Sequence, residues 1–266
     1  MERIILIETS TALCSTALAE NGAIVSYRES SAPKAHASLT AVFIQEMLSE
    51  RGLSLSDCDA ICVSKGPGSY TGLRVGVSTA KGLCFGSGKP LIAVGTLDTL
   101  VAQAAEECCP ESPDCHPERS EGSPYRFIIP MIDARRMEVY TAVFEPSVIP
   151  SEPSVIPSGP SVIPSEAEGS ACYRQITETA PMIIDENSFA DYLEQGPCLF
   201  IGDGAGKCAD VIRHPNARFC QCQPKASAML SPALNAYKEE RFEDVAYFEP
   251  FYLKEFVATV SKKKLW

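Results

Sequence analysis

The chain has 266 residues, 45% of them hydrophobic, so it can form one large domain or two smaller ones around an ordinary core. Its formal net charge is −11 and its pI is about 4.9. A protein that grips nucleic acid by itself presents a basic face to the phosphates, so this charge disfavours direct, tight nucleic-acid binding. The cluster Lys262-Lys263-Lys264 is expected to be a solvated tail.

The twelve cysteines and three histidines show no spacing typical of a metal site. No two cysteines are spaced C-x-x-C, and the histidines form neither H-x-x-x-H nor H-E-x-x-H. The apolar run after Glu2 and Arg3 is too short for a signal sequence, and no run approaches the length of a membrane span. We therefore expect reduced thiols, a cytoplasmic location, no membrane association and no bound metal.

The first hundred residues predict the order β-β-β-α-β-α. The expected elements are strands at 3–9, 13–19, 23–29, 60–64 and 90–94, and helices at 36–51 and after Ser69. Asn21-Gly22 is a strong signal for a hairpin turn, and Thr96 is expected to cap a further helix.

The second part of the chain repeats this order. Its expected elements are strands at 127–132, 137–144, 171–176 and 198–201, and helices at 186–193 and after 202–206. Two βββαβα halves predict an α/β protein with two tandem ribonuclease-H-like lobes, the actin-like (ASKHA) ATPase fold. We place the first lobe at 1–100 and the second at 101–266.

Two stretches depart from this order. Residues 146–166 contain Pro-Ser-Val-Ile-Pro-Ser three times, and 110–124 are similarly rich in Pro, Ser and Glu. Proline recurs too often for a helix or a central strand, so we expect extended, mobile insertions near 110–124 and 146–170, with a proline-motif ligand as the alternative. Deleting 146–166 should shift the thermal melt by only a few degrees.

The most distinctive stretch is 65–82, which follows a short buried strand. Gly66-Pro67-Gly68 predicts a tight turn and Ser69 an N-cap. Each glycine inside a helix costs about 1 kcal/mol relative to alanine, so Gly72 and Gly76 suggest that another helix or a ligand comes close. The spacing fits neither a Walker A loop nor a Rossmann loop, which favours a packing helix over a phosphate site.

Several motifs carry a resemblance to a known family. The stretch G-P-G-S-Y-T-G-L-R-V-G-V-S-T-A-K-G-L at 66–83 closely matches the signature of the TsaB family, and I-E-T-S-T-A-L-C-S-T-A-L at 7–18 is similar to its opening. The motifs I-D-A-R-R-M-E-V-Y, G-D-G-A and P-F-Y-L-K follow in family order at 132–140, 202–205 and 250–254. The resemblance covers nearly the whole chain outside the two insertions.

The resemblance implies a non-catalytic scaffold subunit with the actin-like fold. Such a subunit partners the catalytic subunit TsaD, which transfers threonylcarbamoyl to the adenosine beside the anticodon of tRNAs reading A-starting codons. The ATPase TsaE docks on that pair, and the free subunit forms homodimers through helices of its first lobe. ATP and metal are then expected on the partner subunits, and tRNA is expected to be met only through the complex.

The residues expected at the docking helices lie on the two helices of the first lobe: His36, Leu39, Phe43, Gly72, Arg74, Gly76 and Ala80. We expect the glycines to leave room for a partner's backbone. On that hypothesis Gly76→Leu abolishes pairing while the monomer stays folded.

The segment Glu8-Thr9-Ser10 resembles a vestigial nucleotide loop. Ser10 stands where a glycine would let backbone amides approach a phosphate, and Glu8 would place a magnesium-linked carboxylate differently from an aspartate. TsaD-like enzymes carry H-x-x-x-H on the helix that begins here at His36, but Thr40 replaces the second histidine.

Other readings remain open at this point. Asp133, Arg135, Arg136 and Glu138 form either an acid/base cluster or, as we favour, a charged hairpin turn. The rival functions are an independent actin-like-clan ATPase or small-molecule kinase, an M22-type peptidase, and a tRNA-binding module.

Overall fold

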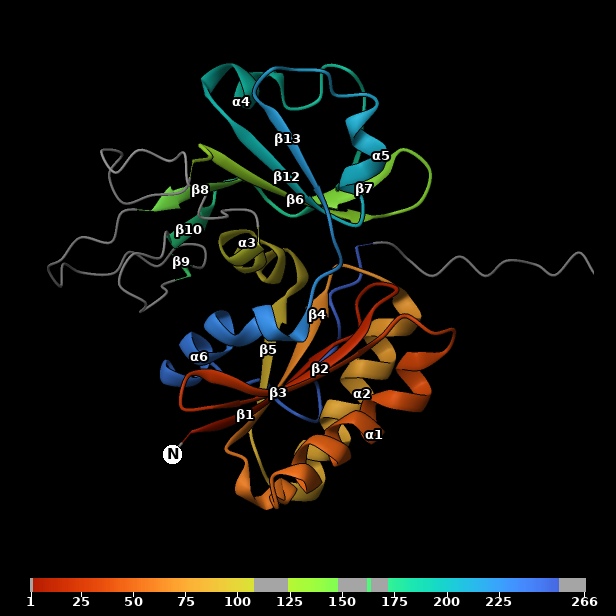
Figure 1. Cartoon of the computed structure of the whole chain (residues 1–266), viewed down its shortest axis with the longest axis vertical. Coiled ribbons are helices and arrows are strands. Elements are labelled where there is room, and N and C mark those ends of the chain that lie inside the picture. Colours follow the sequence, from red (N-terminus) through yellow and green to blue (C-terminus); the bar gives the residue numbers. More distant parts are fainter. Residues whose placement is uncertain (1, 108–123, 148–161, 164–171, 254–266) are drawn as a thin grey trace, which may run out of the picture.

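The computed structural model describes residues 2–107, 124–147, 162–163 and 172–253. Two α/β lobes stack along the long axis of the molecule (Figure 1). The predicted insertion at 110–124 lies outside the described residues except for Pro124. Most of the insertion at 146–166 also lies outside them, although β9 (Val162–Ile163) pairs with a neighbouring strand.

The first lobe is built on a five-stranded sheet with the strand order β3-β2-β1-β4-β5. Its strands are β1 (Arg3–Glu8), β2 (Cys14–Glu20), β3 (Ala23–Ser30), β4 (Ala60–Gly66) and β5 (Leu91–Gly95). The hairpin between β2 and β3 turns at Asn21 and Gly22, both at positive φ, as the sequence predicts. Strands β1 to β3 are antiparallel neighbours, whereas β4 and β5 run parallel to β1.

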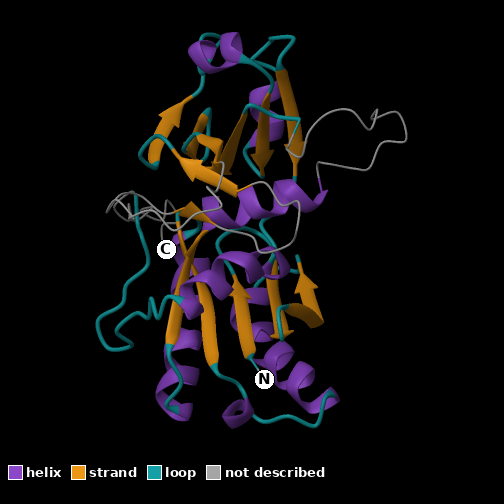
Figure 2. Cartoon of the chain, turned by 90° about the vertical axis from the view of Figure 1, so that its left-hand side faces the viewer, coloured by secondary structure: helices purple, strands orange, loops and turns teal. Residues whose placement is uncertain are grey.

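Helices cover both faces of this sheet (Figure 2). α1 (Ala35–Glu50) and α2 (Tyr70–Ser87) pack on one face, where Ile44, Val77 and Ile5 belong to one buried cluster. On the other face, η2 (Ala226–Met229) and α6 (Leu230–Lys238) bury Met229 together with several alanine side chains. The short η1 (Leu55–Asp57) precedes β4.

The second lobe contains the larger sheet. Its strands are β6 (Phe127–Asp133), β7 (Glu138–Thr141), β8 (Phe144–Ser147), β9, β10 (Cys172–Gln175), β11 (Ala180–Ile183), β12 (Cys198–Gly202) and β13 (Ala217–Gln221). α4 (Ala190–Gln195) and α5 (Ala205–Ala209) belong to this lobe. α3 (Thr96–Glu107) packs on the opposite face of the sheet and lies between the two lobes (Figure 1).

The expected domain boundaries require a correction. Residues 101–266 were assigned to the second lobe, but Ala226, Met229 and Ala233 pack against Ile4 and Leu6 of the first lobe. The chain therefore returns to its first lobe after β13.

The segment after α6 continues across the first lobe. Phe251 N donates to Lys65 O at 2.7 Å, and Lys81 Nζ donates to the carbonyls of Ala246 and Phe248, both at 3.1 Å. These contacts fasten the segment to α2 and to the end of β4.

Three local expectations also differ from the structure. The single strand expected at 137–144 is divided into β7 and β8, and the edge strand β11 was missed. The helix expected at 186–193 begins only at Ala190, because Phe189 has φ 66° and cannot belong to a right-handed helix.

Within the part of the chain that the structure describes, no helix is both long and apolar enough to cross a bilayer. Eight cysteines in these ranges are free thiols.

Candidate functional site

α2 is an 18-residue helix whose two ends are set by its sequence. Ser69 caps the start, with its Oγ accepting a hydrogen bond from Gly72 N at 3.3 Å. Gly88 ends the helix in the left-handed conformation at φ 69°. The Leu73, Val77 and Cys84 side chains are buried, so the helix is amphipathic.

The inner face of α2, formed by Gly72, Gly76 and Ala80, is buried inside the first lobe. A Cβ added at Gly72 or Gly76 would lie inside 3.0 Å of Thr9, a separation that real Cβ atoms essentially never show. Thr9 Oγ1 donates to Gly72 O at 2.9 Å. The expectation that these three residues receive a partner is therefore wrong. Gly72 and Gly76 make room for the chain's own β1–β2 loop, and Ala80 belongs to the buried core of the first lobe.

The outer face of α2 consists of Arg74, Ser78, Gly82, Phe85 and Gly86, all exposed. Phe85 is 88% exposed. A Cβ added at Gly82 or Gly86 would meet no described atom within 4 Å. These two glycines therefore serve no packing purpose within the described chain, although each weakens the helix by about 1 kcal/mol relative to alanine.

The docking residues expected on α1 are less exposed than the outer face of α2. His36, Leu39 and Phe43 are half-buried, whereas Val42, which was not among the expected docking residues, is 42% exposed. His36 Nε2 lies 2.9 Å from Thr11 O, so this side chain ties α1 to the β1–β2 loop.

Arg74 lies on the outer face but is engaged by its own helix. Its Nη1 donates to Tyr70 Oη at 3.2 Å, and its guanidinium lies 5.5 Å from the centre of the Tyr70 ring. Tyr70 in turn packs on Tyr252, with ring centroids 4.8 Å apart. In the isolated chain, Arg74 is therefore held against Tyr70 of the same helix.

The sequence contains a signal for the exposure of Phe85. The buried stripe of α2 falls at Leu73, Val77, Ala80 and Cys84, and Phe85 lies off that stripe. A large apolar residue off the buried stripe of an amphipathic helix is expected to be exposed.

The Glu8-Thr9-Ser10 segment is enclosed by the chain itself. Ser10 N donates to Glu8 Oε1 at 2.6 Å, and Thr9 N lies 3.4 Å from Ser64 Oγ. A Cβ added at Gly68 would clash with Ser10. The amides that would have to approach a phosphate are engaged, and α2 begins directly over the segment.

Glu8 is fully buried, and burial raises the pKa of its carboxyl to about 7, against the opposing effect of hydrogen bonds from Ser10 and Ser64. Its Oε2 has no hydrogen-bond partner among the described residues. Glu8 is therefore a group whose charge depends on pH near neutrality.

The position that replaces the second histidine of the metal pair has a structural role. Thr40 Oγ1 donates to His36 O at 2.6 Å and lies 3.3 Å from Cys14 Sγ. Among the described residues, no three or more His, Cys, Asp or Glu side chains are grouped so as to hold a metal ion.

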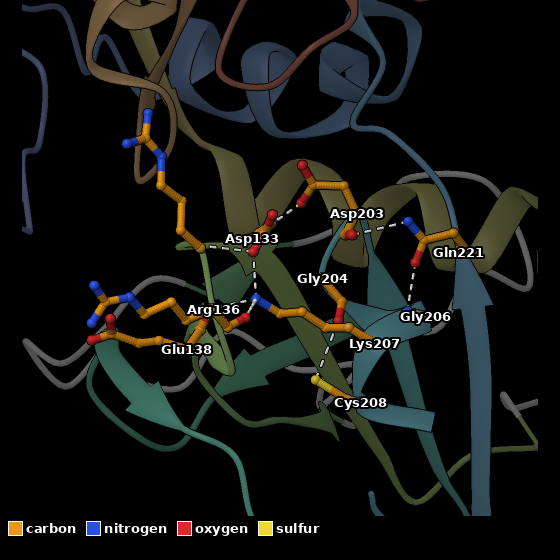
Figure 3. A network of polar contacts seen from close by, with 10 residues as sticks. Asp133, Arg136, Glu138, Asp203, Gly204, Gly206, Lys207, Cys208 and Gln221 are labelled. Carbon is orange, nitrogen blue, oxygen red and sulfur yellow. Dashed lines mark hydrogen bonds and ion pairs between the residues drawn. The ribbon is translucent and has the colours of Figure 1, made fainter. Parts of the chain in front are cut away.

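The charged turn after β6 forms the network shown in Figure 3. Asp133 Oδ1 accepts from Arg135 N at 2.9 Å and pairs with Lys207. Lys207 Nζ also donates to the carbonyls of Arg136 and Glu138, at 2.8 and 2.7 Å. Arg135 and Arg136 are exposed, at φ 70° and 53°. This geometry agrees with a hairpin turn closed by Asp133, as favoured above.

Asp203 joins this turn to the Gly-rich segment before α5 (Figure 3). Its Oδ1 accepts from Asp133 N at 2.8 Å, and its carbonyl accepts from Gln221 Nε2 at 2.9 Å. Burial raises the pKa of Asp203 to about 6. The side chain holds the ends of two neighbouring strands together.

Comparison with known proteins shows which families this chain resembles. The family model for TsaD, tRNA N6-adenosine threonylcarbamoyltransferase, matches residues 27–148. The tRNA threonylcarbamoyladenosine biosynthesis protein TsaB of Escherichia coli (strain K12) is 36% identical over 143 residues, which are 54% of this chain and 55% of that protein. The chain thus spans about half the length of the curated relatives it matches.

Two further comparisons extend this result. The tRNA N6-adenosine threonylcarbamoyltransferase of Jannaschia sp. (strain CCS1) is 47% identical over 66 residues, 25% of this chain and 18% of that protein. The solved structure of YeaZ from Pseudomonas aeruginosa superimposes with a TM-score of 0.72 at 24% identity, covering 95% of this chain and 100% of the other. The α/β fold of two ribonuclease-H-like lobes is confirmed. The chain is therefore a homologue of the TsaB proteins and has the fold of YeaZ.

Proposed function

We propose that this chain is a non-catalytic subunit that pairs with a TsaD-like threonylcarbamoyltransferase through the outer face of α2. The observation that carries the proposal is the exposure of Phe85, which is 88% exposed and lies between Gly82 and Gly86 in the helix. No contact within the described chain explains why these two positions lack a side chain. Burying a phenylalanine side chain contributes about 1.5–3 kcal/mol. Gly82 and Gly86 would let a partner helix approach the backbone on either side of Phe85.

The kind of partner follows from the relatives. The transferase family model covers 27–148, a range that contains both α1 and α2. A TsaD-like protein is thus expected to present a similar helix pair, and two similar helix pairs can associate about a pseudo-two-fold axis. The pair would convert the adenosine beside the anticodon of tRNAs that read A-starting codons into threonylcarbamoyladenosine. This chain would contact tRNA only within the complex.

The remaining assignments belong to the same proposal. Catalysis, ATP and metal are assigned to the partner subunits, because the amides of the Glu8-Thr9-Ser10 segment bind Glu8 and Ser64 rather than lying open. A TsaE-like ATPase would dock on the pair. In the absence of the transferase, two copies of the outer face would form an isologous homodimer.

Reconstitution tests the proposal. Purified TsaD-like transferase, a TsaE-like ATPase, a synthase that supplies threonylcarbamoyl-adenylate, and unmodified tRNA would be incubated with and without this chain. We expect modified adenosine only when the chain is present, and co-elution of the chain with the transferase. Modification of equal rate without the chain would refute the subunit assignment. Micromolar binding of ATP and magnesium by the isolated chain, measured calorimetrically, would instead support the independent nucleotidase.

The oligomeric part is tested separately by light scattering. The free chain is expected to be a dimer that an excess of transferase converts into a mixed dimer. A homodimer that persists alongside bound transferase would show that the two pairings use different surfaces.

A further inference from the structure

The segment after α6 lies along one flank of α2, and we call its residues 244–253 the strap. Tyr252 packs on Tyr70 at the start of the helix, with ring centroids 4.8 Å apart. Further along the helix, Lys81 Nζ donates to two carbonyls of the strap, both at 3.1 Å. Because the earlier strap residues meet the later part of the helix, the strap runs antiparallel to α2.

A single turn of the strap holds Tyr247 in place. Asp244 Oδ1 accepts from the amides of Ala246 and Tyr247, at 2.8 and 3.2 Å, and Asp244 O accepts from Phe248 N at 2.8 Å. Val245 and Phe248 pack against the buried core of the first lobe. Tyr247, by contrast, is 83% exposed. The backbone that carries this exposed tyrosine is therefore fixed before any partner binds.

Lys81 brings Tyr247 close to Phe85. The carbonyls that Lys81 holds belong to Ala246 and Phe248, the residues on either side of Tyr247. Residues four apart in a helix are surface neighbours with Cβ atoms about 5–6 Å apart, so Lys81 and Phe85 lie side by side on α2. Phe85 and Tyr247 are also the two most exposed large hydrophobic residues in the part of the chain that the structure describes. The helix and the strap therefore present them on one continuous surface.

The outer face of α2 is too small to be a stable docking surface by itself. It consists of Arg74, Ser78, Gly82, Phe85 and Gly86, whereas stable interfaces use about 20–30 residues on each side. The docking residues expected on α1 are half-buried and add little exposed area. The strap supplies further surface on its flank of the helix, including a tyrosine, one of the residue types that dominate interfaces.

We infer that the surface that docks the TsaD-like transferase is composite, formed by the outer face of α2 together with the strap, with Tyr247 as a second aromatic anchor beside Phe85. The inference rests on the proposed function and deepens it. Lys81 is a positioning residue, because it holds the turn that carries Tyr247. Since that turn is already formed in the free chain, its backbone need not be ordered on binding.

Calorimetric titration of the full chain with the transferase tests the second anchor. Tyr247→Ala should raise the dissociation constant about tenfold, as expected for an interface residue of this type. Because the side chain is exposed, the urea midpoint of this variant should equal that of the wild type. The matched control is Phe242→Ala, which removes an aromatic side chain that is 41% exposed and packs on Tyr237 of α6. It should leave the dissociation constant unchanged.

Lys81→Met tests the positioning role. The change keeps the aliphatic stem but removes both hydrogen bonds to the strap, and it should raise the dissociation constant by less than Tyr247→Ala does. In the Tyr247→Ala background it should have no further effect, because no side chain is left to position. Lys81→Arg retains a donor and should restore the affinity. An equal effect of Lys81→Met in both backgrounds would overturn the positioning role.

The outcomes separate the inference from the proposed function. If the wild-type chain does not bind the transferase, the proposed function fails and the composite surface fails with it. If Phe85→Ala weakens the pairing but Tyr247→Ala does not, the inference alone is overturned. It is also overturned if Tyr247→Ala weakens only the homodimer, measured by light scattering, and leaves the affinity for the transferase unchanged.

Discussion

The two faces of α2 carry glycines at the same four-residue spacing for opposite reasons. On the inner face, Gly72 and Gly76 leave no room for a Cβ, because Thr9 occupies that space. On the outer face, Gly82 and Gly86 have open space around them, with the exposed Phe85 between them. The spacing of glycines in a helix therefore does not by itself show whether another segment of the same chain lies against them. Burial of each face decides that question.

The largest effect is expected from filling the inner face. Gly76→Leu forces a branched side chain into the space of Thr9, and such overpacking destabilises by about 1–3 kcal/mol and occasionally more. We expect loss of the cooperative urea transition or a large fall in its midpoint, which corrects the earlier expectation of a folded monomer. The matched Gly82→Leu should keep the cooperative transition, with a midpoint at or above that of the wild type, because leucine is a better helix former than glycine and meets no neighbour there. Equal midpoints for the two variants would break the distinction between the faces.

The next effect concerns Glu8, in the segment against the inner face. Its folded pKa of about 7 is above the ordinary 4.5, so the folded chain keeps a proton that the unfolded chain releases. The raised pKa of Glu8 therefore makes its full contribution to the free energy of unfolding below about pH 4.5, and this contribution is lost as the pH rises to about 7. Glu8→Gln removes this dependence, and at pH 8 it should be more stable than the wild type by about 2–3 kcal/mol.

Urea unfolding of both proteins at several pH values measures this difference. Asp203, whose pKa is also raised, contributes equally to both proteins, so the difference isolates Glu8. A difference that is independent of pH would show that Glu8 does not titrate in this range.

The smallest expected effect is that of adding a single methyl group to each face of α2, and its sign should differ between the two faces. Gly82→Ala meets no neighbouring atom and should stabilise the chain by about 1 kcal/mol, the difference in helix propensity. Gly72→Ala, on the inner face, should instead destabilise it. Thermal melts of the two variants would contradict the assignment of faces if both shifts had the same sign.

The sequence predicted much of the first lobe because its signals are local. Asn21-Gly22, Ser69 and the periodicity of α1 and α2 are each read from neighbouring residues. The long-range contacts were not predictable in this way. Nothing near α6 indicates that Met229 packs beneath Ile4, so the return of the chain to the first lobe was missed.

The sequence also predicted only part of the candidate site, because the packing of α2 against the β1–β2 loop depends on long-range contacts. The sequence identified α2 as the important helix and Arg74 as a residue of its surface. It assigned the docking role to Gly72 and Gly76, because spacing alone does not reveal that Thr9 fills the inner face. Phe85 could have been found, since it lies off the buried stripe.

The central claim is tested most directly by the dissociation constant of the chain and a TsaD-like transferase, measured by calorimetry for the wild type and two variants. Phe85→Ala removes the exposed side chain of the outer face, and Ile183→Ala removes a side chain that is 73% exposed on the second lobe. We predict that Phe85→Ala raises the dissociation constant about 30-fold or more, as expected for a residue that dominates an interface, and that Ile183→Ala leaves it unchanged. An unchanged constant for Phe85→Ala, or an equal rise for Ile183→Ala, would contradict the account.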